Sequence, residues 1–130
     1  MRGSGGGDII FAEESFRIQG ALFEVYRTMG AGFLESVYRG CLPLELAKRD
    51  VPFVRHPPLP LTYKGEPLRQ IFVADFICYE RIILELKAVR AIAPEHRAQA
   101  INYLRATGMK LAVLANFGAT PKVEIERFAL

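Results

Sequence analysis

The first regular pattern of apolar positions runs from residue 12 to residue 29. Its aliphatic side chains recur at intervals of three and four residues, at Ile18, Leu22, Val25 and Met29. This is the period of a helix with one buried face, so we predict a helix over residues 12–29. Gly30 follows directly and is suited to end that helix.

A second helical pattern covers residues 34–49. One broad face collects its apolar residues, which are Leu34, Val37, Tyr38, Cys41, Leu42 and Leu46. Pro43 lies inside this pattern, and a proline in a helix interior costs about 3 kcal/mol or kinks the helix. We therefore expect a bend between Arg39 and Pro43, or a helix that restarts there.

The rest of the chain is dominated by strand patterns, with one further helix. The proline-rich segment 51–70 excludes a helix and predicts an edge strand or extended arm that ends in a turn at Lys64-Gly65. The β-rich runs 71–79 and 81–89 are almost contiguous and predict a hairpin. Pro94 is suited to the first position of a helix that Gly108 ends, and two strands follow within 110–118 and 122–128. The expected order is α-α-β-β-β-α-β-β, an α/β fold.

Length and composition limit the number of domains, the cellular compartment and the partners that we expect. A chain of 130 residues with 51% hydrophobic and 24% charged residues suits one globular domain. Cys41 and Cys78 fit neither a disulfide framework nor a metal-binding pair, which favours a reducing compartment, and we expect a cytoplasmic location. No apolar run approaches the roughly 18 residues of a membrane span, so no membrane association is expected. The net charge of +3 mildly favours a polyanionic partner.

The amino-terminal segment has a different composition from the rest. Residues 1–8 read MRGSGGGD and lack the apolar stretch of a signal peptide. We interpret them as a flexible leader or an expression remnant. Residues 9–130 are then expected to form a single domain.

Three charged residues interrupt the two apolar runs of the predicted hairpin. Asp75 lies in the first run, and Glu85 and Lys87 lie in the second. Residues two apart on a strand share a face, so Glu85 and Lys87 leave the same side of the sheet. Buried charges are costly unless they are paired or bind a metal. Three of them on adjacent strands therefore indicate a site.

The register of the hairpin decides whether Asp75 belongs to that site. A two-residue loop would place Asp75 opposite Leu86, with its side chain on the face away from Glu85. A three-residue loop at residues 79–81, or a bulge, would place Asp75 directly opposite Glu85. We predict this shifted register, although the loop contains no glycine that would indicate it.

Two carboxylates that converge on one face make an oxygen-rich site, which suits Mg²⁺ or Mn²⁺ and not Zn²⁺. A lysine beside the metal can orient or deprotonate a water, or stabilise charge on a phosphate. The chemistry implied is metal-assisted hydrolysis of a phosphodiester. The alternative that spacing alone leaves open is a salt bridge between a carboxylate and Lys87 within the sheet.

Other polar residues each have two interpretations. Three side chains of the predicted helix 94–107 share a face that either orients a substrate phosphate or is partly solvated surface: His96, Gln99 and Tyr103. Glu35, in the first turn of the second helix, either interacts with the helix dipole or adds a third acid to the site. Three arginines either contact a nucleic-acid backbone or are ordinary surface residues: Arg90, Arg97 and Arg105.

Together these residues resemble the motifs of the PD-(D/E)xK nuclease superfamily. Asp75, nine intervening residues and then Glu85-Leu86-Lys87 resemble its D…(D/E)xK signature. The pair Gln99-xxx-Tyr103 resembles the QxxxY motif of its RecB-like branch. The segment GFLESVY resembles the signature of the small GxxExxY proteins of that superfamily, through Gly32, Glu35 and Tyr38. The likeness extends over roughly residues 10 to 128.

The resemblance implies a restriction-endonuclease-like α/β core, with a central mixed β-sheet flanked by helices. It implies that Asp75, Glu85 and the carbonyl of Leu86 bind Mg²⁺ or Mn²⁺ and that Lys87 is the catalytic lysine. Glu35 would complete the acidic site. Gln99 and Tyr103 would orient the active site or contact DNA.

Three positions depart from the family pattern. Ala74 stands where a proline often precedes the signature aspartate, and Asp50 stands where a glycine is expected to end the second helix. Pro43 is unusual in that helix and raises the question of whether it displaces Glu35. None of these departures removes a catalytic group.

We therefore expect a metal-dependent nuclease that hydrolyses phosphodiester bonds of DNA, with RNA left open as a substrate. The alternative is a catalytically weak or inactive nucleic-acid-binding module of the same fold. A third interpretation is a structural protein with a salt bridge in its sheet, which does not explain Glu35, Gln99 and Tyr103 occurring together. We favour a homodimer, because a chain of this size has little surface for holding a duplex.

Overall fold

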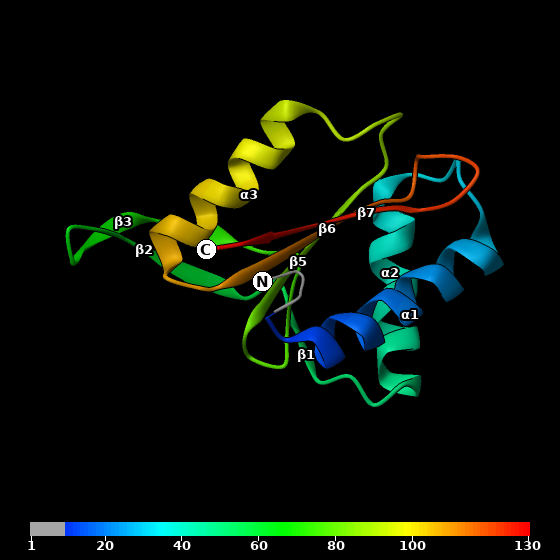
Figure 1. Ribbon diagram of the computed structural model, residues 1–130, viewed down its shortest axis with the longest axis horizontal. Coiled ribbons are helices and arrows are strands. Elements are labelled where there is room, and N and C mark those ends of the chain that lie inside the picture. The colour runs from blue at the N-terminus through cyan, green and yellow to red at the C-terminus, as the bar shows by residue number, and fades with distance from the viewer. Residues whose placement is uncertain (1–9) are drawn as a thin grey trace.

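The computed structural model describes residues 10–130, so the expected leader at residues 1–8 lies outside the described residues. Three helices and seven strands follow one another along the chain (Figure 1). The helices are α1 (Ala12–Met29), α2 (Glu35–Lys48) and α3 (Pro94–Thr107). The strands are β1 (Phe53–Arg55), β2 (Pro58–Tyr63), β3 (Glu66–Val73), β4 (Phe76–Cys78), β5 (Ile82–Lys87), β6 (Leu111–Asn116) and β7 (Glu124–Ala129).

Five strands form the central sheet, in the order β1-β4-β5-β6-β7. Strands β5 and β6 are parallel, and the other neighbouring pairs are antiparallel, so the sheet is mixed. The parallel pair is joined through α3, as a parallel connection requires. This arrangement confirms the expected α/β class with a mixed sheet between helices.

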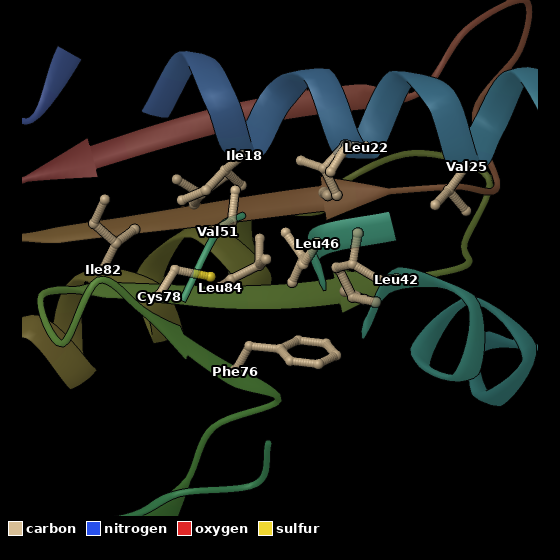
Figure 2. Packing of buried hydrophobic residues seen from close by; sticks show 14 of the residues in the cluster. Ile18, Leu22, Val25, Leu42, Leu46, Val51, Phe76, Cys78, Ile82 and Leu84 are labelled. Carbon is tan, nitrogen blue, oxygen red and sulfur yellow. The ribbon is translucent and has the colours of Figure 1, made fainter. Parts of the chain in front are cut away.

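The helices cover opposite faces of this sheet. On one face, Ile18 and Leu22 of α1 and Leu42 of α2 pack with Leu84 and Leu86 of β5. Figure 2 shows Ile18, Leu22 and Val25 of α1 above the apolar side chains of β4 and β5, with Leu42 and Leu46 of α2 beside Leu84. On the other face, a smaller cluster joins the central sheet to α3. Its buried members include Ile77, Ile83, Ala100, Leu104 and Ala112. Any side chain of β5 that points away from α1 and α2 therefore faces the α3 side.

The expected three strands before α3 are five in the structure. The chain leaves the central sheet after β1, forms the β2–β3 hairpin as a separate two-stranded sheet, and returns to the central sheet at β4. Figure 1 shows that hairpin projecting beyond the central sheet on the α3 side. The segment where the chain leaves the central sheet is hydrogen-bonded to the segment where it returns. His56 N–H donates to the carbonyl of Asp75 at 2.9 Å, and Ala74 N–H donates to that of Pro57 at 3.3 Å. The run 71–79 is therefore two strands, divided next to Asp75.

Helix α2 runs unbroken through Pro43, so the expected restart of the helix at this proline is wrong. Pro43 cannot donate to the carbonyl four residues before it, but its ring and its neighbour Leu42 are buried. The burial of these two side chains offsets the missing hydrogen bond. Asp50 adopts the left-handed conformation that a glycine would supply after the helix, with φ of 57°.

No helix within residues 10–130 is long and apolar enough to cross a membrane.

Candidate active site

The turn between β4 and β5 sets the register that brings the two carboxylates together. Residues 79–81 form a three-residue loop, and the strand partners on either side are Cys78↔Ile82, Ile77↔Ile83 and Phe76↔Leu84. Continuing this register by one residue places Asp75 opposite Glu85, which confirms the predicted shift. Tyr79 and Glu80 both adopt positive φ, at 55° and 60°, although neither is glycine. Tyr79 N–H donates to the carbonyl of Pro52 at 2.9 Å, which ties this turn to the segment before β1.

Asp75 and Glu85 are held by hydrogen bonds across the end of the hairpin. The main-chain N–H of Asp75 donates to Oε2 of Glu85 at 2.6 Å, and the main-chain N–H of Leu86 donates to Oδ2 of Asp75 at 2.8 Å. Because β4 begins only at Phe76, the N–H of Asp75 is not used in the β4–β5 ladder and donates to the Glu85 carboxylate instead. Each carboxylate is thereby fixed through one oxygen.

Glu85 and Lys87 lie on the same face of β5, as the strand period predicts. Leu84 and Leu86 alternate with them and are completely buried on the opposite face, against α1 and α2. No ion pair within 4.0 Å joins Lys87 to Glu85 or Asp75, so the structure does not contain the alternative salt bridge within the sheet.

The pKa of Glu85 is raised to about 7. Burial is the largest cause, because desolvation disfavours the charged carboxylate, and the neighbouring charge of Asp75 acts in the same direction. The hydrogen bond from the Asp75 N–H and the charge of Lys87 oppose this change, and the charge of Glu35 adds to it. The charges of Asp75, Lys87 and Glu35 thus all act on the pKa of Glu85.

Helix α2 brings Glu35 to this cluster through the loop before it. The hydroxyl of Tyr38 donates to the carbonyl of Gly30 at 2.6 Å and accepts from Phe33 N–H at 3.2 Å. Its ring stacks on Phe117, which follows β6, with 4.5 Å between ring centroids. Gly32 has φ of 110°, which other residues rarely adopt. Gly32 and Tyr38 therefore shape the α1–α2 loop that begins the helix carrying Glu35.

Sequence reasoning missed Arg39, which lies one turn after Glu35 on α2. Its guanidinium forms an ion pair with Glu35, and Nη1 lies 3.8 Å from Oδ1 of Asp75. The side chains of Arg39 and Asp75 are only 29% and 18% exposed, so this contact is partly shielded from water. The spacing of four residues from Glu35 to Arg39 on a helix is the sequence signal that could have found it.

The two polar residues of α3 from the QxxxY pattern contact each other. Nε2 of Gln99 donates to the hydroxyl of Tyr103 at 3.2 Å, and the Tyr103 ring stacks on Phe72 of β3 with 3.5 Å between centroids. Within residues 10–130, no hydrogen bond joins either side chain to Asp75, Glu85 or Lys87. Tyr103 therefore anchors α3 to the β2–β3 hairpin, and Gln99 is bonded to Tyr103.

His96 and the three arginines proposed from the sequence have different contacts in the structure. Nδ1 of His96 accepts from the main-chain N–H of Ala93 at 3.0 Å and caps the beginning of α3. Arg97 forms two hydrogen bonds with Glu126 of β7, at 2.7 and 2.8 Å. Arg90 and Arg105 are exposed, and neither has an ion-pair partner among the described residues. Arg90 lies in the loop that follows Lys87.

Sequence reasoning also missed a buried polar network behind that loop. Oδ1 of Asn116 accepts from Val89 N–H at 2.9 Å and from Gly118 N–H at 3.0 Å. Glu124 accepts from the Asn116 side chain and from the main-chain N–H of Ile92. Asn116 is fully buried at the end of β6, beside Lys87 in the strand register. It fixes the path of the chain from Lys87 to α3, and no charge or spacing distinguished it in the sequence.

The donor set fits a hard divalent cation. Oδ1 of Asp75 and Oε1 of Glu85 accept no hydrogen bond within residues 10–130, so each carboxylate has one oxygen to offer. Ala74, the residue that would pair with the Leu86 carbonyl, donates to Pro57 instead. Two carboxylates, one carbonyl and several waters are the ligands that Mg²⁺ prefers. No group of three or more His, Cys, Asp or Glu side chains in the described chain could hold a metal ion, and Glu35 is directed to Arg39.

A mixed sheet between helices, with two fixed carboxylates and a lysine where its hairpin divides, defines an α/β protein with a restriction-endonuclease-like core. The model of the PD-(D/E)XK nuclease superfamily matches residues 12–128. The chain belongs to this superfamily, which confirms the resemblance seen in its sequence motifs. The comparisons found no matching curated protein and no matching solved structure.

Proposed function

We propose that this protein is a metal-dependent nuclease that hydrolyses phosphodiester bonds of DNA with Mg²⁺ or Mn²⁺. Membership of the nuclease superfamily supports a nuclease-type function. The observation that carries the proposal is the reciprocal bonding of Asp75 and Glu85, which leaves one oxygen of each carboxylate without a hydrogen bond within residues 10–130. A site without catalytic use has no evident reason to keep these charges half-buried.

The proposed roles follow from these positions. Asp75, Glu85 and the Leu86 carbonyl hold the cation, which when bound supplies positive charge to the phosphate and lowers the pKa of a coordinated water. Lys87, beside Glu85, orients that water or donates to the charge that develops on the phosphate. Glu35 supplies further negative charge from α2. Tyr103, bonded to Gln99, holds α3 against the β2–β3 hairpin, and the two residues in this way orient the nucleic-acid surface.

The test is a cleavage assay on supercoiled and end-labelled linear DNA, with Mg²⁺, Mn²⁺ or EDTA. We expect cleavage that requires the metal and disappears in Lys87→Ala. Lys110→Ala is the matched control, because Lys110 is exposed and directly precedes β6, at the end of the parallel strands away from Lys87. DNA binding without cleavage under every metal would instead support the nucleic-acid-binding module. The same assay on RNA distinguishes the two substrates.

A further inference from the structure

Arg39 lies between two acidic side chains of the proposed site. Its guanidinium pairs with Glu35, and Nη1 lies 3.8 Å from Oδ1 of Asp75. The other oxygen of Asp75 accepts the N–H of Leu86. The atom nearest to Arg39 is therefore the Asp75 oxygen that is left to bind a cation.

A guanidinium and a divalent cation cannot share these oxygens without strong repulsion. The guanidinium of arginine carries a permanent positive charge. The side chains of Arg39 and Glu35 are about one-third exposed, and their pair is screened less than a pair fully in water. A cation bound by Asp75 and Glu85 must therefore displace the guanidinium from Asp75.

The residue that follows α2, Arg49, is a second arginine for comparison. Arg49 pairs with Glu45 at the same spacing of four residues, with 2.8 Å between Nε and Oε2. The ion pairs of the described chain include no further carboxylate for Arg49, whereas Arg39 reaches Asp75 on another element. The Asp75 contact is thus not a consequence of helix spacing alone.

We propose that Arg39 is the counter-cation of the metal-free acidic cluster, leaves Asp75 when Mg²⁺ or Mn²⁺ binds, and then contacts a phosphate of the DNA. This inference rests on the proposed metal site. The planar guanidinium can donate two parallel hydrogen bonds to a phosphate, which an ammonium cannot do. Arg39 therefore couples metal binding to substrate binding as a positioning residue.

The test measures Mn²⁺ binding by calorimetry for the wild type, Arg39→Met, Arg39→Lys, Arg49→Met and Asp75→Asn. Arg39→Met removes the competing charge, so we expect it to bind Mn²⁺ about tenfold more tightly than the wild type. Arg39→Lys keeps the charge and should bind Mn²⁺ as the wild type does, but it should bind DNA more weakly because the bidentate contact is lost. Arg49→Met should match the wild type in both measurements, and thermal unfolding in EDTA checks that each variant folds.

The outcomes separate this inference from the proposed function. If the wild type binds Mn²⁺ and Asp75→Asn does not, the proposed metal site stands. Equal Mn²⁺ affinities for the wild type, Arg39→Met and Arg49→Met would then overturn the role of Arg39 alone. If neither the wild type nor Arg39→Met binds Mn²⁺, the metal site and the inference both fail. Binding by Arg39→Met but not by the wild type would support the role of Arg39 in its strongest form.

Discussion

The main-chain N–H of Asp75 donates a 2.6 Å hydrogen bond to the carboxylate of Glu85, ten residues further along the chain. The Asp75 carboxylate in turn accepts the N–H of the residue after Glu85. The N–H of Asp75 is available for the bond to Glu85 because the β4–β5 ladder begins one residue later, at Phe76. The break between β3 and β4 is therefore what allows Asp75 and Glu85 to be bonded to each other.

Glu85→Gln is expected to lower DNA cleavage by at least about 100-fold, since a metal ligand contributes several kcal/mol of charge stabilisation. The amide oxygen of glutamine can still accept the N–H of Asp75, so the fold should survive. Rates of plasmid nicking under saturating Mn²⁺ measure the loss, and thermal unfolding checks the fold. Nicking by Glu85→Gln at the wild-type rate would exclude Glu85 as a ligand.

The raised pKa of Glu85 predicts a pH dependence of stability for the metal-free protein. The folded protein holds this proton up to a pH of about 7, whereas the ordinary value is 4.5. Tighter binding of the Glu85 proton by the folded state stabilises that state. This contribution to the unfolding free energy is complete below pH 4.5 and is lost as the pH rises through about 7, where the proton leaves the folded state too. The unfolding free energy of the wild type minus that of Glu85→Gln, measured by urea denaturation in EDTA, should therefore fall as the pH rises from 4.5 to about 7. A difference that is constant or rises would contradict the shifted pKa.

The sequence predicted the register of the β4–β5 hairpin and the face shared by Glu85 and Lys87, but not the path of the chain around them. Strand period alone placed Glu85 and Lys87 on one face, and the requirement that Asp75 join them selected the three-residue loop. The loop itself carries no local signal, since Tyr79 and Glu80 adopt positive φ without being glycine. Local chemistry could therefore not have chosen the register.

The features that the sequence did not reveal depend on contacts between distant segments. The run 71–79 is continuously β-rich, and its division at Ala74 arises from bonds to residues 56 and 57. Asn116 is a single neutral side chain whose role appears only when Val89 and Glu124 surround it. Helix bounds were predicted closely, because their period and their terminal residues are encoded within each helix.

Tyr38→Phe tests how α2 is placed. This change removes two hydrogen bonds that join the helix to Gly30 and Phe33, at a cost of about 1–3 kcal/mol for the buried groups left without a partner. Because the loop then holds Glu35 less firmly, cleavage should fall more than folding stability alone explains. Chemical denaturation and nicking rates measure the two effects. Tyr63→Phe, at an exposed position, should change neither.

Gly118→Ala tests the support of the loop between Lys87 and α3. A Cβ at this position would collide with the main chain of Val89, so we expect a loss of about 1–3 kcal/mol in unfolding free energy. Gly40→Ala is the matched control, because a Cβ there meets nothing within 4 Å. In the middle of α2 it should stabilise the protein by about 0.5–1 kcal/mol. Equal stabilities for the two variants would contradict the close approach at Gly118.

Arg90→Ala and Arg97→Ala should affect DNA binding differently. Arg90 is exposed in the loop after Lys87, and removing a phosphate contact there should weaken binding and reduce the salt dependence of affinity by about one counterion. Arg97 is already bonded twice to Glu126, so Arg97→Ala should leave the salt dependence unchanged and lower stability by about 1 kcal/mol at most. Fluorescence anisotropy with labelled DNA in EDTA, at several salt concentrations, measures both variants without cleavage. A reduced salt slope for Arg97→Ala but not for Arg90→Ala would reverse these assignments.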